Sequence, residues 1–393
     1  MPGGKNRKWT VLLGENGTGK STILKAIALL MAGSDALVDL VANPNDWIRI
    51  GQKQGAIEGS IETKRGEVRD LKLVFKRNQS ISAFINQSVK TLEPLNDALE
   101  HSSRNYMVIG YGASRRLTTG KSSVSLEKQQ PRARSMASLF NRNAELNPLE
   151  QWAMDLDYQS NGQKMGTVKK VLSDFLPELT FTRIDKKART LLFNTADGLV
   201  PLEQLSDGYQ NVAAWVGDLL YQISEIFQDY KNPLKARGLL IIDEVDLHLH
   251  PKWQRSLLSF LEERLPNMQL VVTTHSVVTA QQSPQDALFY CIRRQGKAPE
   301  IVAFEGNPGK LLLNQLIVTE AFGHIPDESV NLQSSKARYR KLHKKKRKTA
   351  KDKDEMKELS KTIDETPELT SERIVLTEKQ HALIQKMLNS QMG

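Results

Sequence analysis

The chain has 393 residues, with 55 Lys or Arg against 45 Asp or Glu, so its formal net charge is +10 at pH 7. This length allows one large α/β core with insertions or two modest domains. No run of about 18 apolar residues is present, which excludes a membrane-spanning helix. The first residues are polar and basic, unlike a secretory leader. The single cysteine, Cys291, excludes an internal disulfide and predicts a buried strand residue in a reducing, cytoplasmic compartment.

The first half of the chain opens with a strand pattern and a helix pattern around a glycine-rich loop. A buried strand is predicted at residues 9–13, and a helix at 21–31 with Ile23, Ile27 and Leu30 on one face. Further segments follow in chain order: strands at 57–63, 68–76 and 106–111, a polar mobile loop at 117–134, and a mostly helical region at 139–176.

The second half repeats the alternation of apolar strands with helices. A long helix is predicted from Ser206 onward, with a single stripe made by Val212, Val216, Leu219 and Ile223. The other segments are strands at 191–194, 239–242, 269–273, 287–292 and 300–304, a helix at 253–265, and a charged helical hairpin or protruding helix at 334–365.

This alternation predicts an α/β fold with a largely parallel central sheet flanked by helices. We expect one domain at 1–325, with a helical insertion at 138–176. A charged helical extension at 326–393 is expected to follow it.

Residues 14–21 read Gly-Glu-Asn-Gly-Thr-Gly-Lys-Ser and match the phosphate-binding pattern G-x-x-x-x-G-K-[ST]. The glycines let backbone N–H groups point at phosphates, Lys20 adds positive charge, and the Ser21 hydroxyl is a Mg²⁺ ligand. A strand before the loop and a helix after it make a mere glycine-rich helix cap a poor alternative. The sequence therefore predicts binding of ATP and Mg²⁺, with nucleotide contacts from Asn16, Gly17, Thr18, Gly19, Lys20, Ser21 and Thr22.

Two acids end the apolar strand at 239–242. Asp243 can hold Mg²⁺ opposite Ser21, and Glu244 is placed to polarise the attacking water as a general base. An apolar run that ends in Asp-Glu is a weak motif alone. Paired with the phosphate-binding loop, it predicts an ATP-hydrolysing site.

Three further segments surround this pair in the sequence. Residues 205–210, Leu-Ser-Asp-Gly-Tyr-Gln, begin the long helix, where Ser206 would also serve as a helix N-cap. The strand at 269–273 delivers His275 just past its end. His248 and His250, two positions apart, leave a metal site as an alternative.

Together these motifs resemble the ABC-type ATPases of the RecF, SMC and OLD branch, which are P-loop NTPases. The resemblance implies that 205–210 is the signature loop, in which Ser206 and Gly208 contact the γ-phosphate bound by the other subunit. Asp207 stands where the family has glycine, so we expect its side chain to point away. The resemblance also implies that His275 is the switch histidine on the γ-phosphate, and that the stretch around His248 is the D-loop of a dimer interface.

Residues 8–325 further resemble the stand-alone ATPases of the Septu, retron and related anti-phage systems, through the stretches 9–17, 110–115, 242–254 and 319–323. In Septu the ATPase oligomerises and partners an HNH-type nuclease. The resemblance therefore implies head-to-head homodimers or larger homo-oligomers that regulate or sense for a separate nuclease. No acid cluster of the nuclease type found in OLD proteins follows His275, so nuclease activity in this chain is not expected. A RecF-like DNA-binding ATPase of repair or recombination remains the alternative.

Three features leave alternatives open. In this branch the segment 110–116 lies near the nucleotide, so Arg115 either contacts phosphates or is a surface arginine. Family members usually carry two strands before the phosphate-binding loop, so we expect a truncated start or a reduced sheet edge, and the adenine contacts stay unassigned.

The basic stretch 336–353, with Asp352 as its single acid, is either a solvated helix or a surface for nucleic acid or another partner. Tyr339 is its only aromatic residue, so base stacking is not indicated.

Overall fold

The structure is a computed structural model. It describes residues 7–63, 66–115, 130–176, 178–230, 232–295, 298–326, 329–345 and 347–364. The chain divides into two compact units, Met1–Ile325 and Pro326–Gly393. Among the described residues, none of the helices is both long and apolar enough to cross a lipid bilayer.

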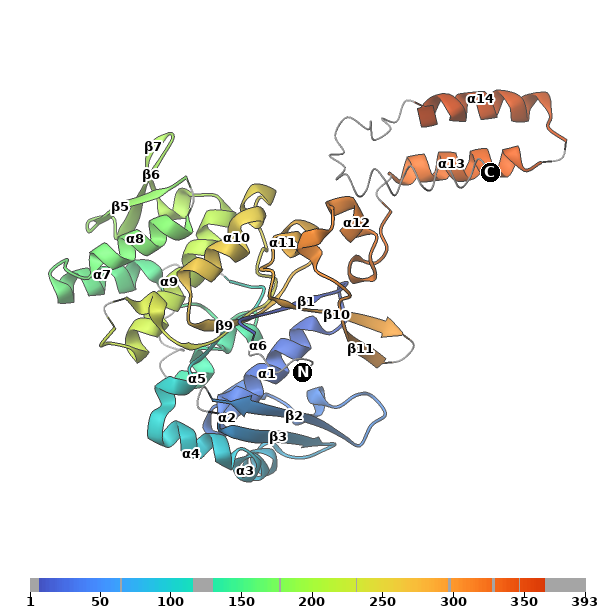
Figure 1. The fold of residues 1–393 in the computed structure, drawn as a ribbon. Coiled ribbons are helices and arrows are strands. Elements are labelled where there is room, and N and C mark those ends of the chain that lie inside the picture. Colours follow the sequence, from blue (N-terminus) through green and yellow to red (C-terminus); the bar gives the residue numbers. More distant parts are fainter. Residues whose placement is uncertain are drawn as a thin grey trace. The chain divides into compact units, whose positions relative to one another are not determined.

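A six-stranded sheet runs through the first unit in the order β11-β10-β1-β9-β8-β4 (Figure 1). Neighbouring strands from β10 to β4 pair in parallel, and β11 pairs antiparallel with β10 at one edge. The predicted α/β fold with a largely parallel sheet is therefore confirmed. The six strands are β1 (Trp9–Leu13), β4 (Val108–Tyr111), β8 (Gly238–Ile242), β9 (Met268–Thr273), β10 (Leu288–Gln295) and β11 (Ala298–Ala303).

Both faces of this sheet are covered, because successive strand residues point to opposite sides. In β1, Val11 and Leu13 join one hydrophobic cluster and Leu12 joins the other. The same alternation in β8 and β9 explains why these strands are apolar without interruption. The first cluster is completed by α7 (Leu149–Ser160), α8 (Met165–Phe175), α9 (Asp207–Ile226) and α10 (Pro251–Arg264).

The helix after the phosphate-binding loop, α1 (Lys20–Ala32), packs into the second cluster together with the hairpin of β2 (Gln54–Glu62) and β3 (Val68–Lys76). The residues predicted to share one face, Ile23, Ile27 and Leu30, all pack against this cluster. Leu24, Ala28 and Leu29 are fully buried, whereas the predicted stripe from Ile23 to Leu30 is only partly buried. The reason is that α1 touches the sheet on one side and β2–β3 on another, so it has two covered faces.

Smaller elements complete this side of the unit. Strands β2 and β3 pair antiparallel and correspond to the strands predicted at 57–63 and 68–76. The remaining helices here are α2 (Leu37–Leu40), α3 (Ile81–Thr91), α4 (Glu93–Ser102), α5 (Pro131–Arg134) and α6 (Ala137–Phe140). The mobile loop expected at 117–134 falls outside the described residues as far as position 129. Its last residues correct the prediction, because α5 is a short helix with Pro131 at its start.

A three-stranded antiparallel sheet follows α8, in the order β5-β6-β7. The prediction at 191–194 corresponds to β6 (Thr190–Thr195), and β7 (Gly198–Pro201) follows a turn. The first strand, β5 (Thr180–Asp185), was missed. Its pairing shifts register between Phe181 and Arg183, which breaks the alternation that sequence patterns rely on. The unit also contains α11 (Val277–Gln281) and α12 (Leu313–Ile317).

The second unit is a helical hairpin in the part that the structure describes. Helices α13 (Val330–His343) and α14 (Ala350–Asp364) lie side by side (Figure 1). An ion pair of 2.6 Å joins Arg338 to Glu355 across the two helices. Leu332 and Leu342 are buried. The charged segment predicted at 334–365 is thus a hairpin rather than a single protruding helix.

Candidate nucleotide-binding site

The predicted site residues gather at one edge of the central sheet. The phosphate-binding loop follows β1, Asp243 and Glu244 follow β8, and His275 follows β9. These strands are parallel neighbours, with β9 between β1 and β8, so their carboxyl ends meet at the same edge. Segments that are more than 220 positions apart in the sequence are thereby brought together. This edge is where parallel α/β sheets bind ligands.

The glycines of the phosphate-binding loop adopt conformations that other residues rarely take. Gly14, Gly17 and Gly19 have φ of +144°, +75° and +109°. A Cβ atom on Gly14 would also lie 2.8 Å from the carbonyl oxygen of Ile292. The loop therefore needs glycine both for its backbone shape and for its packing against β10.

Lys20 is the buried cation at the centre of this loop. Its side chain is 5% exposed, and Nζ donates hydrogen bonds of 2.8 Å to the carbonyl oxygens of Gly14 and Glu15. Burial lowers the pKa of Lys20, and the nearby carboxylates of Asp243 and Glu244 act in the opposite direction. The loop thus holds one positive charge within electrostatic reach of both predicted catalytic acids.

The other predicted phosphate contacts lie on the open side of the loop or at the start of α1. Asn16, Gly17, Ser21 and Thr22 are exposed, whereas Thr18 is buried and donates a hydrogen bond of 2.9 Å to the carbonyl of Glu15. The first N–H groups of a helix have no partner within the helix and carry partial positive charge. This geometry suits the phosphates of a nucleotide.

Asp243 and Glu244 are both oriented by one threonine of the neighbouring strand. Thr273 Oγ1 donates a hydrogen bond of 2.6 Å to Asp243 Oδ1 and accepts one of 2.7 Å from the main-chain N–H of Glu244. Asp243 is 6% exposed. Glu244 has φ of +47°, a strained conformation for a residue other than glycine. Such strain persists only where surrounding contacts hold it.

His275 lies beside Glu244 at the open edge of the site. Its Nε2 is 4.0 Å from Glu244 Oε1, and both side chains are about one third exposed. Burial lowers the pKa of His275, and the positive charge of Lys20 lowers it further. The carboxylates of Glu244, Asp246 and Asp243 oppose this shift without reversing it. The imidazole therefore favours its neutral form more than an ordinary histidine does.

Arg115 lies in the interior behind the two acids, so the alternative of a surface arginine was wrong. It is 2% exposed, and its Nη2 donates a hydrogen bond to the carbonyl oxygen of Glu244. Its Nε and Nη1 have no hydrogen-bond partner among the described residues. Burial lowers the pKa of Arg115 to about 10, against the attraction of Asp243, Asp246 and Glu244. Its contact with phosphates stays a prediction.

The segment after Glu244 is held by a buried acid that sequence reasoning passed over. Asp246 is 6% exposed and accepts hydrogen bonds from the hydroxyls of Thr274, at 2.9 Å, and Thr279, at 2.8 Å. The Nδ1 of His250 is not free for a metal, because it accepts a hydrogen bond of 3.2 Å from the N–H of Lys252 and caps α10. No group of three or more potential ligands exists among the described His, Cys, Asp and Glu residues.

The loop at 205–210, which the sequence predicts as a signature loop, has an exposed Ser206 side chain at the start of α9. Ser206 occupies the N-cap position of α9, as predicted, but its side chain makes no capping hydrogen bond. The amide of Gln210 instead donates a hydrogen bond of 2.6 Å to the carbonyl of Leu205. A Cβ on Gly208 would lie 2.9 Å from the carbonyl oxygen of His248, so this loop touches the segment after Glu244.

The donor set fits a magnesium ion. A hydroxyl from Ser21 and a carboxylate from Asp243 are hard oxygen ligands of the kind that Mg²⁺ takes. Thr273 bonds Oδ1 of Asp243, which leaves Oδ2 for a metal ion. Mg²⁺ in nucleotide sites uses one or two protein ligands together with substrate phosphates, so a dedicated cluster of acids is not required.

Residues 319–323, matched in the sequence without an assigned role, pack against the phosphate-binding loop. Gly323 has φ of +77°, a conformation that favours glycine, and it lies beside the exposed side chain of Glu15, which a Cβ at this position would displace. The signal that could have revealed this contact was the glycine itself, at the end of a short Thr-Glu-Ala-Phe-Gly stretch.

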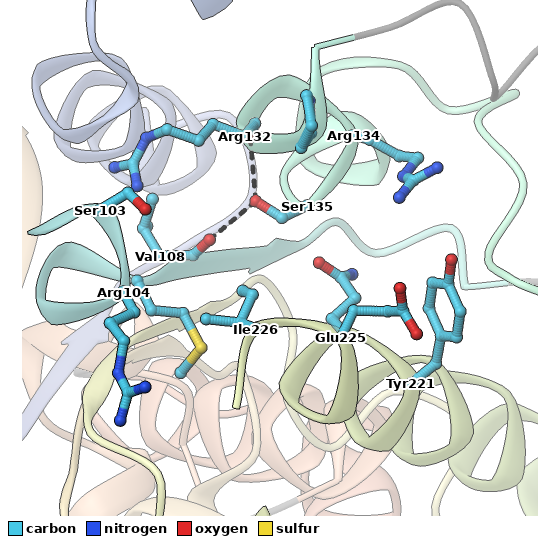
Figure 2. Close-up of a pocket in the computed structure, with 12 residues that line it drawn as sticks. Ser103, Arg104, Val108, Arg132, Arg134, Ser135, Tyr221, Glu225 and Ile226 are labelled. Carbon is cyan, nitrogen blue, oxygen red and sulfur yellow. Dashed lines mark hydrogen bonds between the residues drawn. The ribbon is translucent and has the colours of Figure 1, made fainter. Parts of the chain in front are cut away.

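A separate pocket lies at the opposite edge of the sheet, near the amino end of β4 (Figure 2). Ser135 Oγ lies within hydrogen-bonding distance of the carbonyls of Val108 and Arg132, at 2.8 and 2.9 Å. The guanidinium of the half-buried Arg132 donates hydrogen bonds to the last carbonyls of α1, those of Met31 and Ala32, and desolvation lowers its pKa to about 10. This arginine therefore caps the helix that begins at the phosphate-binding loop.

A comparison with models of known protein families shows to which family the chain belongs. The model described as "AAA domain, putative AbiEii toxin, Type IV TA system" matches residues 71–280, which is more than half of the chain. The chain belongs to this AAA-domain family. The matched part of the family domain contains Arg115, Ser206, Asp243, Glu244 and His275, and the phosphate-binding loop precedes it.

Individual relatives agree with the resemblance drawn from the sequence. The "Septu protein PtuA" of Bacillus mycoides (strain KBAB4) is 29% identical over 273 residues, which cover 69% of this chain and 34% of that protein. The "Retron Ec83 probable ATPase" of Escherichia coli is 32% identical over 119 residues, which cover 30% of this chain and 22% of that protein. The chain thus spans about a third or less of the length of these curated relatives.

The solved structures to which this chain is similar include an SMC head bound to the C-winged helix domain of ScpA. That match has a TM-score of 0.45 and 14% sequence identity, and it covers 76% of this chain and 91% of that one. The predicted resemblance to the ATPases of Septu and retron systems is confirmed by the relatives of this AAA-domain protein.

Proposed function

We propose that the chain binds ATP with Mg²⁺ and hydrolyses it to ADP and phosphate. One observation carries this proposal: the buried Lys20 of a phosphate-binding loop lies within electrostatic reach of Asp243 and Glu244, with His275 4.0 Å from Glu244. Phosphoryl transfer depends on positioning and on stabilising charge, and this arrangement supplies groups for both.

Each residue has a role in this proposal. Lys20 and the N–H groups at the start of α1 bind the β and γ phosphates. Ser21 and Asp243 would hold Mg²⁺, which supplies positive charge against the phosphate oxygens. Glu244 accepts a proton from the attacking water, and His275 contacts the γ-phosphate through an imidazole that burial keeps largely neutral.

Glu244→Gln tests the assignment of the base. The amide keeps the size of the side chain but does not accept a proton, so ATP binding is expected to remain while turnover falls by about a hundredfold or more. Glu263→Gln, at an exposed position on α10, is the matched control. Hydrolysis at the normal rate in Glu244→Gln would remove Glu244 as the base.

We further propose that the complete site forms between two copies of the chain, with Ser206 and Gly208 of one copy closing the nucleotide bound by the other. Two observations support it: the Ser206 hydroxyl is exposed and not used as a helix cap, and Gln210 braces the loop behind it. Ser206→Arg is expected to abolish hydrolysis while ATP still binds.

Mixing two inactive variants tests the shared site. Lys20→Met and Ser206→Arg should each be inactive alone. Together they can form a mixed dimer in which the Lys20 of one copy meets the Ser206 of the other, so part of the activity should return. A mixture that stays inactive, with dimers shown to exchange, would mean that each chain works by itself.

The biological role that we propose is control of a separate nuclease, of the HNH type, in cytoplasmic anti-phage defence. The support is similarity to Septu and retron ATPases. Copurification of the chain with the products of its neighbouring genes, followed by a phage plaque assay with Glu244→Gln, tests it. The proposal is contradicted if no neighbouring gene encodes a nuclease and Glu244→Gln leaves the plaque counts unchanged.

A RecF-like ATPase of DNA repair is the second candidate, and the basic hairpin of α13 and α14 favours it. That role requires DNA to change the rate of ATP turnover. If added duplex DNA binds but leaves hydrolysis unchanged, this candidate fails while the defence role is untouched.

A further inference from the structure

We propose that the distal end of the α13–α14 hairpin binds the phosphate backbone of a nucleic-acid duplex without regard to sequence. The hairpin tip is defined as residues 340–345 and 347–353, at the end of α13 and the start of α14. This goes beyond ATP hydrolysis, and it would hold even if the nucleotide site were inactive.

The hairpin tip concentrates positive charge on exposed side chains. Its exposed cations with described side chains are Arg340, Lys341, Lys344, Lys345, Arg347, Lys348, Lys351 and Lys353. Asp352 is the only acid in this span of the sequence. Within the described residues of the tip, the one ion pair is that of Lys345 with Asp352, at 2.8 Å.

Asp352 is a structural acid and does not offset the remaining cations. It is 8% exposed and accepts hydrogen bonds from Lys345 Nζ, at 2.8 Å, and from the main-chain N–H of Thr349, at 3.0 Å. The bond from Lys345, followed by that from Thr349, lowers the pKa of Asp352 to about 2. Its charge is therefore used to close the turn between the helices.

The charge belongs to one end of the hairpin. Glu355 pairs with Arg338 at the border of the tip, and α14 beyond it carries Glu358 and Asp364 among its lysines. Cations at the last turn of α13 suit the helix dipole, but Lys351 and Lys353 at the first turn of α14 oppose it. Helix stability therefore does not account for them, and an external anion does.

The lack of exposed apolar groups distinguishes among possible anionic partners. Leu342 is fully buried, and it is the only large apolar side chain at the tip in the described residues. Protein interfaces are anchored by aromatic and apolar side chains, and membrane-binding helices insert them into lipid. Contacts with phosphates need only cations on flexible stems. A phosphate backbone therefore fits this surface better than an acidic protein or a lipid bilayer.

A duplex fits better than an unpaired strand. Proteins that bind single strands stack bases on exposed aromatic rings. Tyr339, next to the tip, is half-buried and stacks on His343, with ring centroids 6.2 Å apart. No other aromatic residue lies at 336–353. The hairpin tip thus offers charge and no stacking platform.

Binding to a labelled DNA duplex of random sequence tests the proposal in the full-length chain. Non-specific binding through about five phosphate contacts predicts a dissociation constant in the micromolar range and a slope of about −4.5 for log K against log salt. The tip variant Arg347→Glu with Lys348→Glu should weaken binding at low salt by about tenfold or more and reduce the slope by about 2.

The matched control changes the same amount of charge on the same hairpin. Lys357→Glu with Lys361→Glu alters two exposed lysines of α14 outside the tip, and it should leave binding within about twofold. A duplex RNA, a polyglutamate peptide and vesicles with anionic lipid serve as competing probes. The helical signal by circular dichroism confirms that both variants fold.

Several results would overturn the proposal: no duplex binding at low salt, equal losses in the tip and control variants, or stronger binding to polyglutamate or vesicles than to duplex. ATP hydrolysis measured without nucleic acid should be the same in both variants as in the original chain. Failure of duplex binding is thus distinguishable from failure of the nucleotide site.

Discussion

The guanidinium of Arg115 donates a hydrogen bond of 2.5 Å to the main-chain carbonyl oxygen of Glu244. Glu244 has φ of +47°, so this contact holds a strained peptide in place. On the other side of the same residue, Thr273 Oγ1 accepts the N–H of Glu244. The proposed base is therefore fixed through its backbone from two directions.

Arg115→Met is expected to lower kcat by about tenfold to a hundredfold, because misplacing a catalytic group by about 1 Å has an effect of that size. ATP affinity should change by less than about threefold if Arg115 acts through Glu244. A loss of affinity with kcat unchanged would instead show that Arg115 contacts phosphates. Titration calorimetry with ATP and steady-state kinetics give the two numbers.

Two further variants control for the loss of a buried charge. Arg132→Met removes a half-buried arginine that lies at the opposite edge of the sheet, so it should lower the melting temperature without the same fall in kcat. Arg115→Lys keeps the charge and should recover part of kcat if the contact with the Glu244 carbonyl is what matters.

The pKa of His275 predicts a small pH dependence of stability. Its folded-state pKa lies below the ordinary value of 6.5, because of burial and then of Lys20. Between these two values the unfolded chain binds a proton that the folded chain does not, so stability rises with pH and is lost as pH falls. When the pH is lowered from about 8 to about 5, the melting temperature of His275→Gln should therefore fall by less than that of the original chain.

The effect is small because His275 is one third exposed and solvent screens its interactions. His101→Gln, at an exposed histidine outside the site, is the control and should follow the original chain. Parallel pH curves for His275→Gln and the original chain would mean that His275 does not contribute this dependence.

Sequence alone predicted the parts of this site that depend on local patterns. A glycine-rich loop, a lysine at the start of a helix and an apolar strand that ends in two acids are all readable, because each combines a residue type with a spacing. The strands β1, β8 and β9 were readable for the same reason, since their apolar runs bury both faces of a covered sheet.

What was missed depends on contacts between distant segments. The roles of Asp246 and Gly323 come from partners that are 28 or more positions away, Thr274 and Glu15 among them. For Arg115, a surface position stayed open as an alternative because nothing near it in the sequence shows that α/β packing encloses it. The strand β5 was missed because its register shift breaks the local alternation.

Asp246→Ala is expected to lower the free energy of unfolding by about 3 kcal/mol, because it leaves the buried hydroxyls of Thr274 and Thr279 without their charged acceptor. Asp246→Asn keeps one acceptor and should lose about 1 kcal/mol. Asp207→Ala, at an exposed acid, should stay within about 0.5 kcal/mol. Denaturant unfolding measures all three, and equal stability of Asp246→Ala and Asp207→Ala would contradict the bracing role.

Gly208→Ala tests the contact between the signature loop and the segment after Glu244. The added Cβ would lie 2.9 Å from the carbonyl oxygen of His248, which is main chain and moves only together with its segment. We therefore expect a loss of about tenfold in kcat, since both segments are proposed to close the nucleotide of a second copy. ATP affinity, which depends on Lys20 and the start of α1, should be retained.

Gly166→Ala separates this contact from the general effect of replacing a glycine in a helix. Gly166 lies in α8, and a Cβ there would meet no atom within 4 Å. Alanine should stabilise the chain by about 0.5–1 kcal/mol at this position and leave kcat unchanged. If Gly208→Ala behaves like Gly166→Ala in both measurements, the signature loop does not depend on its approach to His248, and the proposed closure of the shared site would have to rest on Ser206 alone.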